Sequence, residues 1–590
     1  MGEPPGSMVL ITTALQETFP KDINEKVLFL GEWCKIYNNK SDWEIFNSQT
    51  MSYHWDDRKK LYRDHQNIQI IYEKILFELS NKLNQIHRVN YSLRYWRILI
   101  GPWLGYFTQV LFDRWFMLNS VFDNNQAYHC YVIKRDPLSF VPNDMNHLQQ
   151  WIFSDNWNEA IYGQLMELCW TTRVNITWIE KIKKTPQSFV KKIPIKKIIQ
   201  VKILPFFNKL FMNDSNHFFI SSYLSLKTEL KLQVRLGQIP NIWKTQSLPI
   251  MQSCIEQRKW QLNGEKSSTF EEVLRKMIPM HIPTSYLEGY LILNETAENL
   301  PWPKTPKSIF TSVSYARDDL FKAWAAKKTE NNVPLIIGQH GGHFGMSPFA
   351  LQEEHQIKIA DKWLSWGWHD KNRKNITPVG NLKAIGKKIG YNPNGGALMV
   401  EMGMPRYSFN LYPVPMASQY LDYFNDQKIF LSSLTIELRQ QVLLRLCYSD
   451  FDWNQADRWK DSMPEVNIDP GRKNIEQLIR KSRLYIATYN ATTYLEALTW
   501  NVPTIMFWNP KHWELNKQAK PYFELLEKEG IFHTTPESAA NKMIEIWDDV
   551  DGWWHSNKIQ KARKVFIDQY AGLPEDPLNL LQDIFEHNIE

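Results

Sequence analysis

The sequence lacks the features that mark disulfide-rich, zinc-binding and membrane-spanning proteins. Its 590 residues include five cysteines, which are scattered and form neither a C-x-x-C pair nor a cysteine–histidine cluster, so no disulfide framework or zinc site is predicted. No uncharged apolar run reaches the roughly 18 residues of a membrane span, and no apolar signal core opens the chain. We therefore expect a cytoplasmic protein, soluble or peripheral at the inner membrane.

Two other absences concern ligands. No Asp-x-Asp pair stands at a strand end in a setting that suggests a metal site, so we expect no metal and no separate cofactor. The net charge is only +6. No nucleic-acid-binding motif accompanies that charge, so nucleic acid is not an expected partner.

The positive charge is unevenly distributed along the chain. The segment from Lys181 to Lys202 contains eight lysines and no acidic residue, with isoleucine, valine and phenylalanine between them. Such a segment suits an anionic membrane surface or an acidic acceptor. A solvated basic face has the same composition, and both interpretations stay open.

The chain is too long for one compact core, so two or three domains are expected. Apolar runs at 8–14 and 26–31 predict the first strands of a doubly wound α/β sheet, and helical periodicity follows from Ile68 to Ile86. Turn-forming residues at 391–396 predict a linker. The expected parts are an N-terminal Rossmann-like domain with helical insertions at 8–390, a C-terminal Rossmann-like domain at 396–565, and a final helix at 566–590 that packs back on the first domain.

Four carboxylates of the first domain are candidates for the acceptor side. Two of them follow expected strands, where open α/β sheets bind their ligands, and the other two form an aspartate pair just before the long helical segment. We expect the acceptor and the reacting groups beside them. The aspartates also have a structural interpretation as partners of nearby arginines, if these are buried. The four are Glu17, Glu32, Asp56 and Asp57.

A buried strand at 333–338 ends in the turn Gln339-His340-Gly341-Gly342. Glycines let the backbone approach a ligand closely, and a histidine at the carboxyl end of a strand would project into an interdomain cleft. A lone histidine is more often structural, but this position favours a function. We predict that His340 is catalytic and that Gly341 and Gly342 contact the donor.

The chain is organised around 484–507, where a strand, a turn of small polar residues and a helix precede a second strand. The free N–H groups at the start of the helix and the short side chains around it form a site for an anion. An ordinary capped helix uses the same residues. The residues expected to hold a donor nucleotide are Asn490, Thr492, Thr493 and Glu496, together with Arg406 as a bidentate phosphate ligand or, alternatively, a plain surface arginine.

These motifs resemble known families. The small-residue turn followed by Leu-Glu-Ala-Leu is similar to the nucleotide-sugar site of GT-B glycosyltransferases, in which the acidic residue binds the ribose. The Gln-His-Gly-Gly turn, with the segments 28–34, 53–58, 94–97 and 101–103, resembles a bacterial family of transferases encoded among surface-polysaccharide genes, over nearly the whole chain. Similar turns occur in glycerophosphate polymerases and in capsule sugar transferases that use CMP-linked ulosonates.

The resemblance implies a metal-independent glycosyltransferase with two Rossmann-like domains facing a cleft. The implied donor is a nucleotide-sugar, CMP-linked ulosonates among the candidates, and the implied acceptor is a glycan or glycolipid of polysaccharide or lipopolysaccharide biosynthesis. Two alternatives stay open. One is a CDP-alditol phosphotransferase of the glycerophosphate-polymer type, and the other is a non-enzymatic scaffold with a GT-B-like fold.

Overall fold

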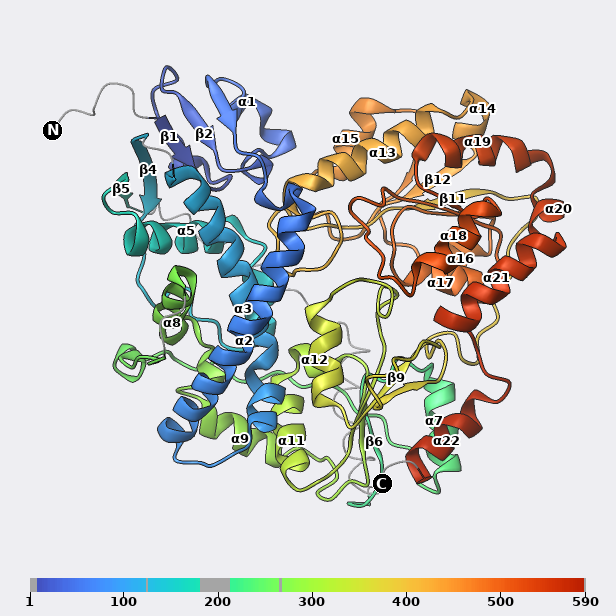
Figure 1. The fold of residues 1–590 in the computed structure, drawn as a ribbon, viewed down its shortest axis with the longest axis horizontal. Helices are drawn as coiled ribbons and strands as arrows, with labels where there is room; N and C mark the ends of the chain where they lie inside the picture. The colour runs from blue at the N-terminus through green and yellow to red at the C-terminus, as the bar shows by residue number, and fades with distance from the viewer. Residues whose placement is uncertain (1–7, 124–125, 181–212, 265–267, 588–590) are drawn as a thin grey trace, which may run out of the picture.

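A computed structural model of the chain describes residues 8–123, 126–180, 213–264 and 268–587 (Figure 1). The basic segment from Lys181 to Lys202 lies outside the described residues. Within the described ranges, none of the helices combines the length and the apolar character that a membrane crossing requires.

The described strands form three sheets, and all of their pairings are parallel. Sheet A contains β1 (Met8–Ile11), β2 (Val27–Phe29), β3 (Ser48–Thr50), β4 (Tyr128–Ile133) and β5 (Val174–Ile179). Sheet B contains β6 (Phe218–Phe219), β7 (Ile309–Thr311), β8 (Leu335–Gly338), β9 (Lys362–Ser365) and β10 (Ile376–Pro378). Sheet C contains β11 (Gly396–Val400), β12 (Val442–Arg445), β13 (Asn467–Asp469), β14 (Ser482–Ala487), β15 (Thr504–Phe507) and β16 (Phe532–His533).

Sheets A and C have the strand order of doubly wound sheets. Their orders are β3-β2-β1-β4-β5 and β13-β12-β11-β14-β15-β16, so the direction of winding reverses beside β1 in sheet A and beside β11 in sheet C. Ligands of such sheets bind at that reversal, outside the carboxyl ends of the strands. Sheet B has the order β10-β9-β8-β7-β6 and therefore no reversal.

The predicted α/β class with parallel sheets is confirmed, but the range expected to form one Rossmann-like domain, 8–390, contains two separate sheets. Strands β6 to β10 form sheet B by themselves. The reason lies in α3 (Leu93–Phe122), which is buried along most of its length and needs cover on every side. It contacts α2 (Arg58–His87) and α5 (Asp155–Cys169) as well as α11 (Asp319–Glu330) and α12 (Leu351–Ile359), so helices of both regions surround it (Figure 1).

The remaining helices cover the sheets and connect their strands. Those before sheet C are α1 (Lys40–Trp43), α4 (Met145–Trp151), α7 (Leu226–Arg235), α8 (Thr269–His281), α9 (Tyr290–Glu298) and α10 (Ser314–Arg317). Those around sheet C and after it are α13 (Tyr420–Ser432), α14 (Ile436–Gln440), α15 (Gln455–Ser462), α16 (Ile475–Ile479), α17 (Thr492–Thr499), α18 (Lys520–Lys528), α19 (Pro536–Ile546), α20 (Val550–Trp554), α21 (Asn557–Tyr570) and α22 (Pro577–His587).

The last two helices cross from sheet C to sheet B (Figure 1). Helix α21 packs on α17 and α18, and α22 contacts α7. The Phe585 ring lies 5.1 Å from that of Phe219 and 5.5 Å from that of Phe310, both in sheet B strands. The end of the described chain thus ties the two sheets together through apolar contacts.

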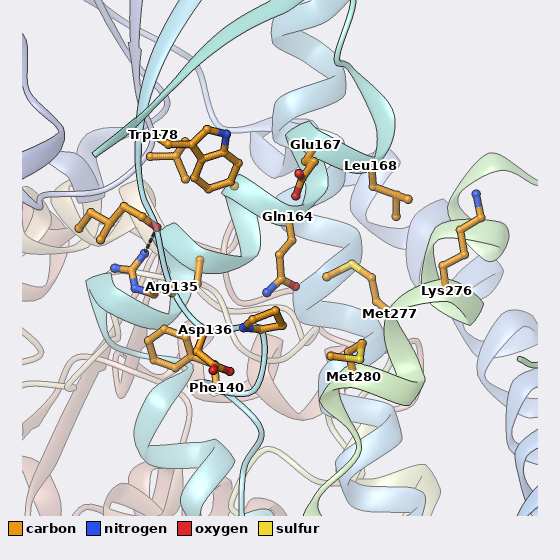
Figure 2. A pocket seen from close by; sticks show the side chains of 15 residues that line it. Arg135, Asp136, Phe140, Gln164, Glu167, Leu168, Trp178, Lys276, Met277 and Met280 are labelled. Carbon is orange, nitrogen blue, oxygen red and sulfur yellow. Dashed lines mark hydrogen bonds between the residues drawn. The ribbon is translucent and has the colours of Figure 1, made fainter. Parts of the chain in front are cut away.

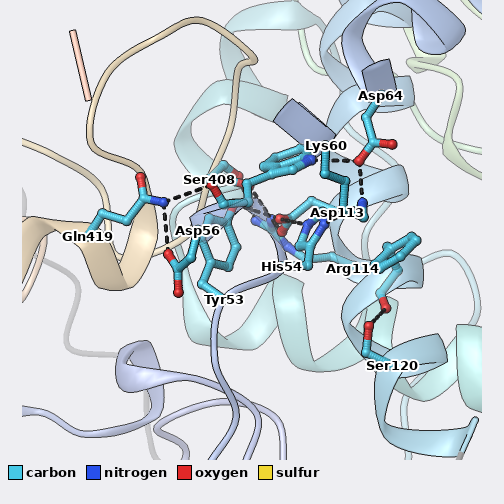
Figure 3. Close-up of polar contacts among 12 residues, drawn as sticks. Tyr53, His54, Asp56, Lys60, Asp64, Asp113, Arg114, Ser120, Ser408 and Gln419 are labelled. Carbon is cyan, nitrogen blue, oxygen red and sulfur yellow. Dashed lines mark hydrogen bonds and ion pairs between the residues drawn. The ribbon is translucent and has the colours of Figure 1, made fainter. Parts of the chain in front are cut away.

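A buried polar network ties the loop after β3 to α3 and to the loop that follows β11. Figure 3 shows Asp113 at its centre. Asp113 Oδ1 accepts a hydrogen bond from Tyr53 Oη at 2.7 Å and lies 3.0 Å from His54 Nε2. Arg114 pairs with the other carboxylate oxygen and donates to Ser408 O at 2.8 Å. Burial alone raises the pKa of Asp113, but the Arg114 charge and the hydrogen bonds of His54 and Tyr53 outweigh it and lower the pKa to about 2.

The substitution Asp113→Ala tests the importance of this network. It should lower the free energy of unfolding by about 3–5 kcal/mol, because it leaves the buried Arg114 charge without its partner. Denaturant titration measures the effect, with Asp123→Ala, at an exposed position just after the same helix, as the matched control. Equal midpoints for the two variants would contradict the assignment.

The same network predicts a pH dependence. The folded-state pKa of Asp113, about 2, lies below the ordinary value of about 3.9. The carboxylate therefore stabilises the fold fully above pH ~4, and this contribution is lost as the pH falls toward ~2. The difference in unfolding midpoint between Asp113→Ala and the wild type should shrink over that interval.

Candidate active site

Gln339 holds the turn that follows β8. Its side-chain nitrogen donates to Gly341 O at 2.7 Å, and its side-chain oxygen accepts from Trp366 N at 2.9 Å and from Trp368 Nε1 at 3.0 Å. The side chain is buried, where satisfied polar groups specify one arrangement of the backbone. The glutamine of the motif is therefore structural, and it positions the histidine that follows.

Gly342 lies directly against the beginning of α17. A Cβ atom at this position would stand 2.2 Å from Ala491 O and 2.9 Å from Thr492 N, so a larger residue does not fit. Ala491 precedes α17 and provides no side-chain cap, which leaves the first N–H groups of the helix available to an anion. The turn after β8 and the start of α17 thus meet backbone to backbone, and the alternative of a side-chain-capped helix does not apply.

The His340 ring is surrounded by aromatic side chains. Its centroid lies 5.2 Å from that of Phe344, 5.9 Å from Tyr315 and 6.1 Å from Tyr223. Helix α10 contributes Tyr315, and the loop after β6 contributes Tyr223. Burial, assisted by the charge of Arg317, lowers the pKa of His340 to about 4. The ring is uncharged at neutral pH, and its buried Nδ1 accepts or donates no hydrogen bond within the described residues.

Glu496 connects α17 to sheet B. It is buried, and its carboxylate lies 2.7 Å from Nζ of Lys383, which follows β10. Burial raises the pKa of Glu496, while the Lys383 charge opposes the rise. Burial also raises the pKa of Tyr223, where Lys383 and Glu496 act in opposite directions. Tyr223, which packs beside the His340 ring, thus also lies within the electrostatic influence of the Glu496–Lys383 pair.

The other predicted donor residues lie around the start of α17. Asn490 Oδ1 accepts a hydrogen bond from Tyr494 Oη at 2.9 Å. Thr492 and Thr493 are half-buried in the first turn of the helix. Together with His340, Gly341, Gly342 and Glu496, they form one continuous group between sheets B and C.

Arg406 lies away from this group and forms an ion pair with Asp155 at the start of α5. Its Nη2 is 2.6 Å from Asp155 Oδ2, and its Nη1 donates to Trp33 O. The side chain is 1% exposed, so it is not a surface arginine. Arg406 joins the loop after β11 to α5 and the loop after β2, and no contact to the turn at His340 is seen among the described residues.

The four predicted carboxylates lie on the sheet A side of the molecule. Two of them, Asp56 and Glu32, belong to segments that contact adjacent residues just before α13. Asp56 Oδ1 accepts from Gln419 Nε2 at 2.9 Å (Figure 3), and the Glu32 backbone N–H donates to Ser418 Oγ at 3.3 Å. Asp57 caps α2 by accepting from Lys60 N at 3.0 Å. Glu17 is exposed. Their catalytic roles stay predictions.

The sequence analysis did not identify two basic residues of the site, Arg317 and Lys383. Arg317 ends α10, is exposed, and has no carboxylate partner among the described residues. It follows β7, which pairs with β8, so adjacent parallel strand ends are the signal that points to it. Lys383 follows β10 in an irregular segment, and no local motif distinguishes it. Across the described part of the chain, no group of three or more histidine, cysteine or acidic side chains is arranged to hold a metal ion.

Comparison with models of protein families identifies the family of the chain. A model described as LIC12162 family transferase matches residues 8–585. The chain therefore belongs to this family of transferases, which confirms the predicted family and the transferase class. A search of curated proteins finds no match.

Several solved glycosyltransferases are distantly similar to the chain. The calicheamicin glycosyltransferase CalG4 is 12% identical, over 50% of this chain and 79% of that one, and the spinosyn rhamnosyltransferase SpnG in complex with spinosyn aglycone is 11% identical, over 50% and 76%. A UDP-glucosyltransferase from Polygonum tinctorium, in complex with 3,4-dichloroaniline, is 11% identical, over 78% and 100%. The TM-score is 0.28 in each case.

The contact between the turn and α17 can be tested with glycine substitutions. Gly342→Ala should destabilise the protein by about 1–3 kcal/mol, because the added methyl group overlaps the backbone at Ala491 and forces it to shift. Gly390→Ala is the control, since a Cβ atom there meets nothing within 4 Å. Thermal and denaturant unfolding of both variants would measure this, and a Gly342→Ala variant as stable as Gly390→Ala would show that the two segments do not touch.

Proposed function

We propose that the protein is a glycosyltransferase that moves a sugar from a nucleotide-sugar to a surface-polysaccharide or glycolipid acceptor. The observation that carries the proposal is the meeting of His340, Gly342 and Lys383 from sheet B with the start of α17 and Glu496 from sheet C. A helix N-terminus without a side-chain cap, the cations Arg317 and Lys383, and an uncharged histidine are groups suited to such a transfer.

In the proposed reaction, an acceptor hydroxyl attacks the anomeric carbon of the donor. The bond between this carbon and the donor phosphate oxygen breaks, and the phosphate leaves with the electron pair. The hydroxyl proton passes to a base, for which we propose His340, because its ring is uncharged at neutral pH and its Nδ1 bonds to none of the described residues.

The leaving phosphate acquires negative charge during this step. The N–H groups that begin α17 and the charges of Arg317 and Lys383 would stabilise it without a metal ion. Asn490, Thr492, Thr493 and Glu496 would hold the nucleotide, with Glu496 on the ribose. We do not assign Arg406 to the phosphate, because its side chain is 1% exposed and lies away from the turn at His340.

The acceptor would approach from sheet A, where Glu32 and Asp56 lie near the beginning of α13. We propose a cytoplasmic reaction, at the inner membrane when the acceptor is a glycolipid. A CMP-linked ulosonate is one candidate donor.

The substitution Glu496→Ala tests the nucleotide site. It should weaken nucleotide binding by about 1.5–3 kcal/mol through loss of a charge-assisted hydrogen bond to the ribose. Calorimetry with the nucleotide of the active donor measures this change, and Glu537→Ala, at an exposed position on α19, is the control. Unchanged affinity in a Glu496→Ala protein that melts normally would refute the assignment.

A panel of UDP-, GDP-, CMP- and CDP-linked donors, assayed for hydrolysis and transfer, tests the proposal as a whole. Turnover of CDP-alditols alone would indicate a phosphotransferase, and turnover of none would indicate a scaffold. With the active donor, His340→Ala should reduce turnover by roughly 10²–10⁴-fold, whereas His369→Ala, at an exposed position, should not.

The pH profile separates a base from a hydrogen-bonding residue at position 340. Because the pKa of His340 is about 4, wild-type turnover that depends on the neutral ring should fall only as the pH drops toward 4. Asn keeps a hydrogen-bonding group but carries no proton, so His340→Asn should be about as slow as His340→Ala. A near-normal rate for His340→Asn would mean that the residue only orients the phosphate.

A further inference from the structure

An apolar cavity lies on sheet A next to the edge strand β5. Its volume is about 450 Å³, within the range of small-molecule sites, and it lies between β4, β5, α5 and α8. Figure 2 shows Met277 and Met280 of α8 opposite Gln164 of α5, with Trp178 and Phe140 at the sides. Thioether and aromatic side chains adapt well to flexible apolar ligands.

The mouth of this cavity exposes apolar surface. Trp178 is 46% exposed and Leu168 is 39% exposed. Large apolar side chains gathered around an open cavity mark a binding surface more often than scattered exposed residues do. The occupant suited to such a cavity is an aliphatic chain.

A second cavity, of about 710 Å³, adjoins the first and shares Lys276 and Met280 with it. Its lining is polar by comparison and includes Trp260, Gln261 and Asn263. The Trp260 indole N–H is buried and has no hydrogen-bond partner in the described part of the chain. An indole face with neighbouring amides is suited to stack on a sugar ring and to hydrogen-bond its hydroxyl groups.

Lys276 stands where the two cavities join. It is exposed and pairs with no carboxylate among the residues described. The other cations of the second cavity are already bound, Arg258 by Glu288, Arg275 by Glu78 and Glu271, and Lys259 by Glu256. Asp136 and Glu167 line the first cavity, and Glu272 lines the second. A negative group of the ligand therefore belongs at the Lys276 junction, where it meets a positive charge, rather than deeper inside either cavity.

We propose that these two cavities form a binding site for an anionic amphiphile, with its aliphatic chain beside Met277 and Met280, its phosphate at Lys276 and a sugar head beside Trp260. This inference goes beyond the proposed function: the ligand carries a phosphate between lipid and sugar, and neither cavity is lined by His340, Glu32 or Asp56.

The site is tested by calorimetry with dodecyl phosphate, dodecyl maltoside and inorganic phosphate, each below the concentration at which micelles form. Dodecyl phosphate should bind the wild type more tightly than inorganic phosphate does. Lys276→Gln should weaken dodecyl phosphate by roughly fivefold to tenfold, the size of one charge-assisted contact, and should leave dodecyl maltoside nearly unchanged. Met280→Gln should weaken both amphiphiles.

Matched controls remove the same kinds of side chain elsewhere. Lys227→Gln on α7 removes an exposed lysine, and Ile70→Gln on α2 removes an apolar side chain that is 69% exposed. Both controls should bind like the wild type. If Met280→Gln does not fold, Leu168→Gln at the exposed mouth replaces it.

Four results would overturn the proposal. The first two are that dodecyl phosphate does not bind the wild type, or that inorganic phosphate binds it as tightly as dodecyl phosphate does. The third is that Lys276→Gln binds dodecyl phosphate with the same affinity as Lys227→Gln. The fourth is that the apolar-site variant binds the amphiphiles with the same affinity as Ile70→Gln. Donor turnover by the wild type is measured separately. Turnover without amphiphile binding refutes only this site, and amphiphile binding without turnover of any donor refutes only the proposed function.

Discussion

The backbone contact between Gly342 and Ala491 is the constraint on which the candidate site depends. It joins the carboxyl end of a sheet B strand to the amino end of a sheet C helix with no side chain between them. Parallel sheets present ligand-binding groups at these ends. A contact between the two ends therefore brings two half-sites together, and the Glu496–Lys383 ion pair spans the same boundary.

Burial determines the charge of the groups in this site. It lowers the pKa of His340 and raises that of Glu496, because a low-dielectric environment disfavours the charged form of each. The positive charge is carried instead by Arg317 and Lys383, which are nearer to solvent. The candidate site thus combines an uncharged imidazole with cations that lie nearer to solvent.

Much of the fold could be predicted because buried parallel strands are continuous apolar runs. The strands β1, β2, β8, β11, β14 and β15 fall in runs of this kind. Sheet B could not be recognised as a separate sheet, since β6 has two residues and β7 has three, too few for any periodicity. The assignment of a strand to a sheet depends on its pairing partners, and these lie far away in the chain.

Local chemistry along the chain was enough to select the Gln-His-Gly-Gly turn and the start of α17 as candidate binding segments, because glycine, histidine and helix N-termini have the same properties in any fold. The apolar runs were enough for the α/β class, and the resemblance of several motifs was enough for the family. The pairing of Lys383 with Glu496, the aromatic surroundings of His340 and the capture of Arg406 by Asp155 required the folded chain. Each of these depends on segments that are distant in sequence and adjacent only after the three sheets have packed, and burial then sets the charge of the groups they bring together.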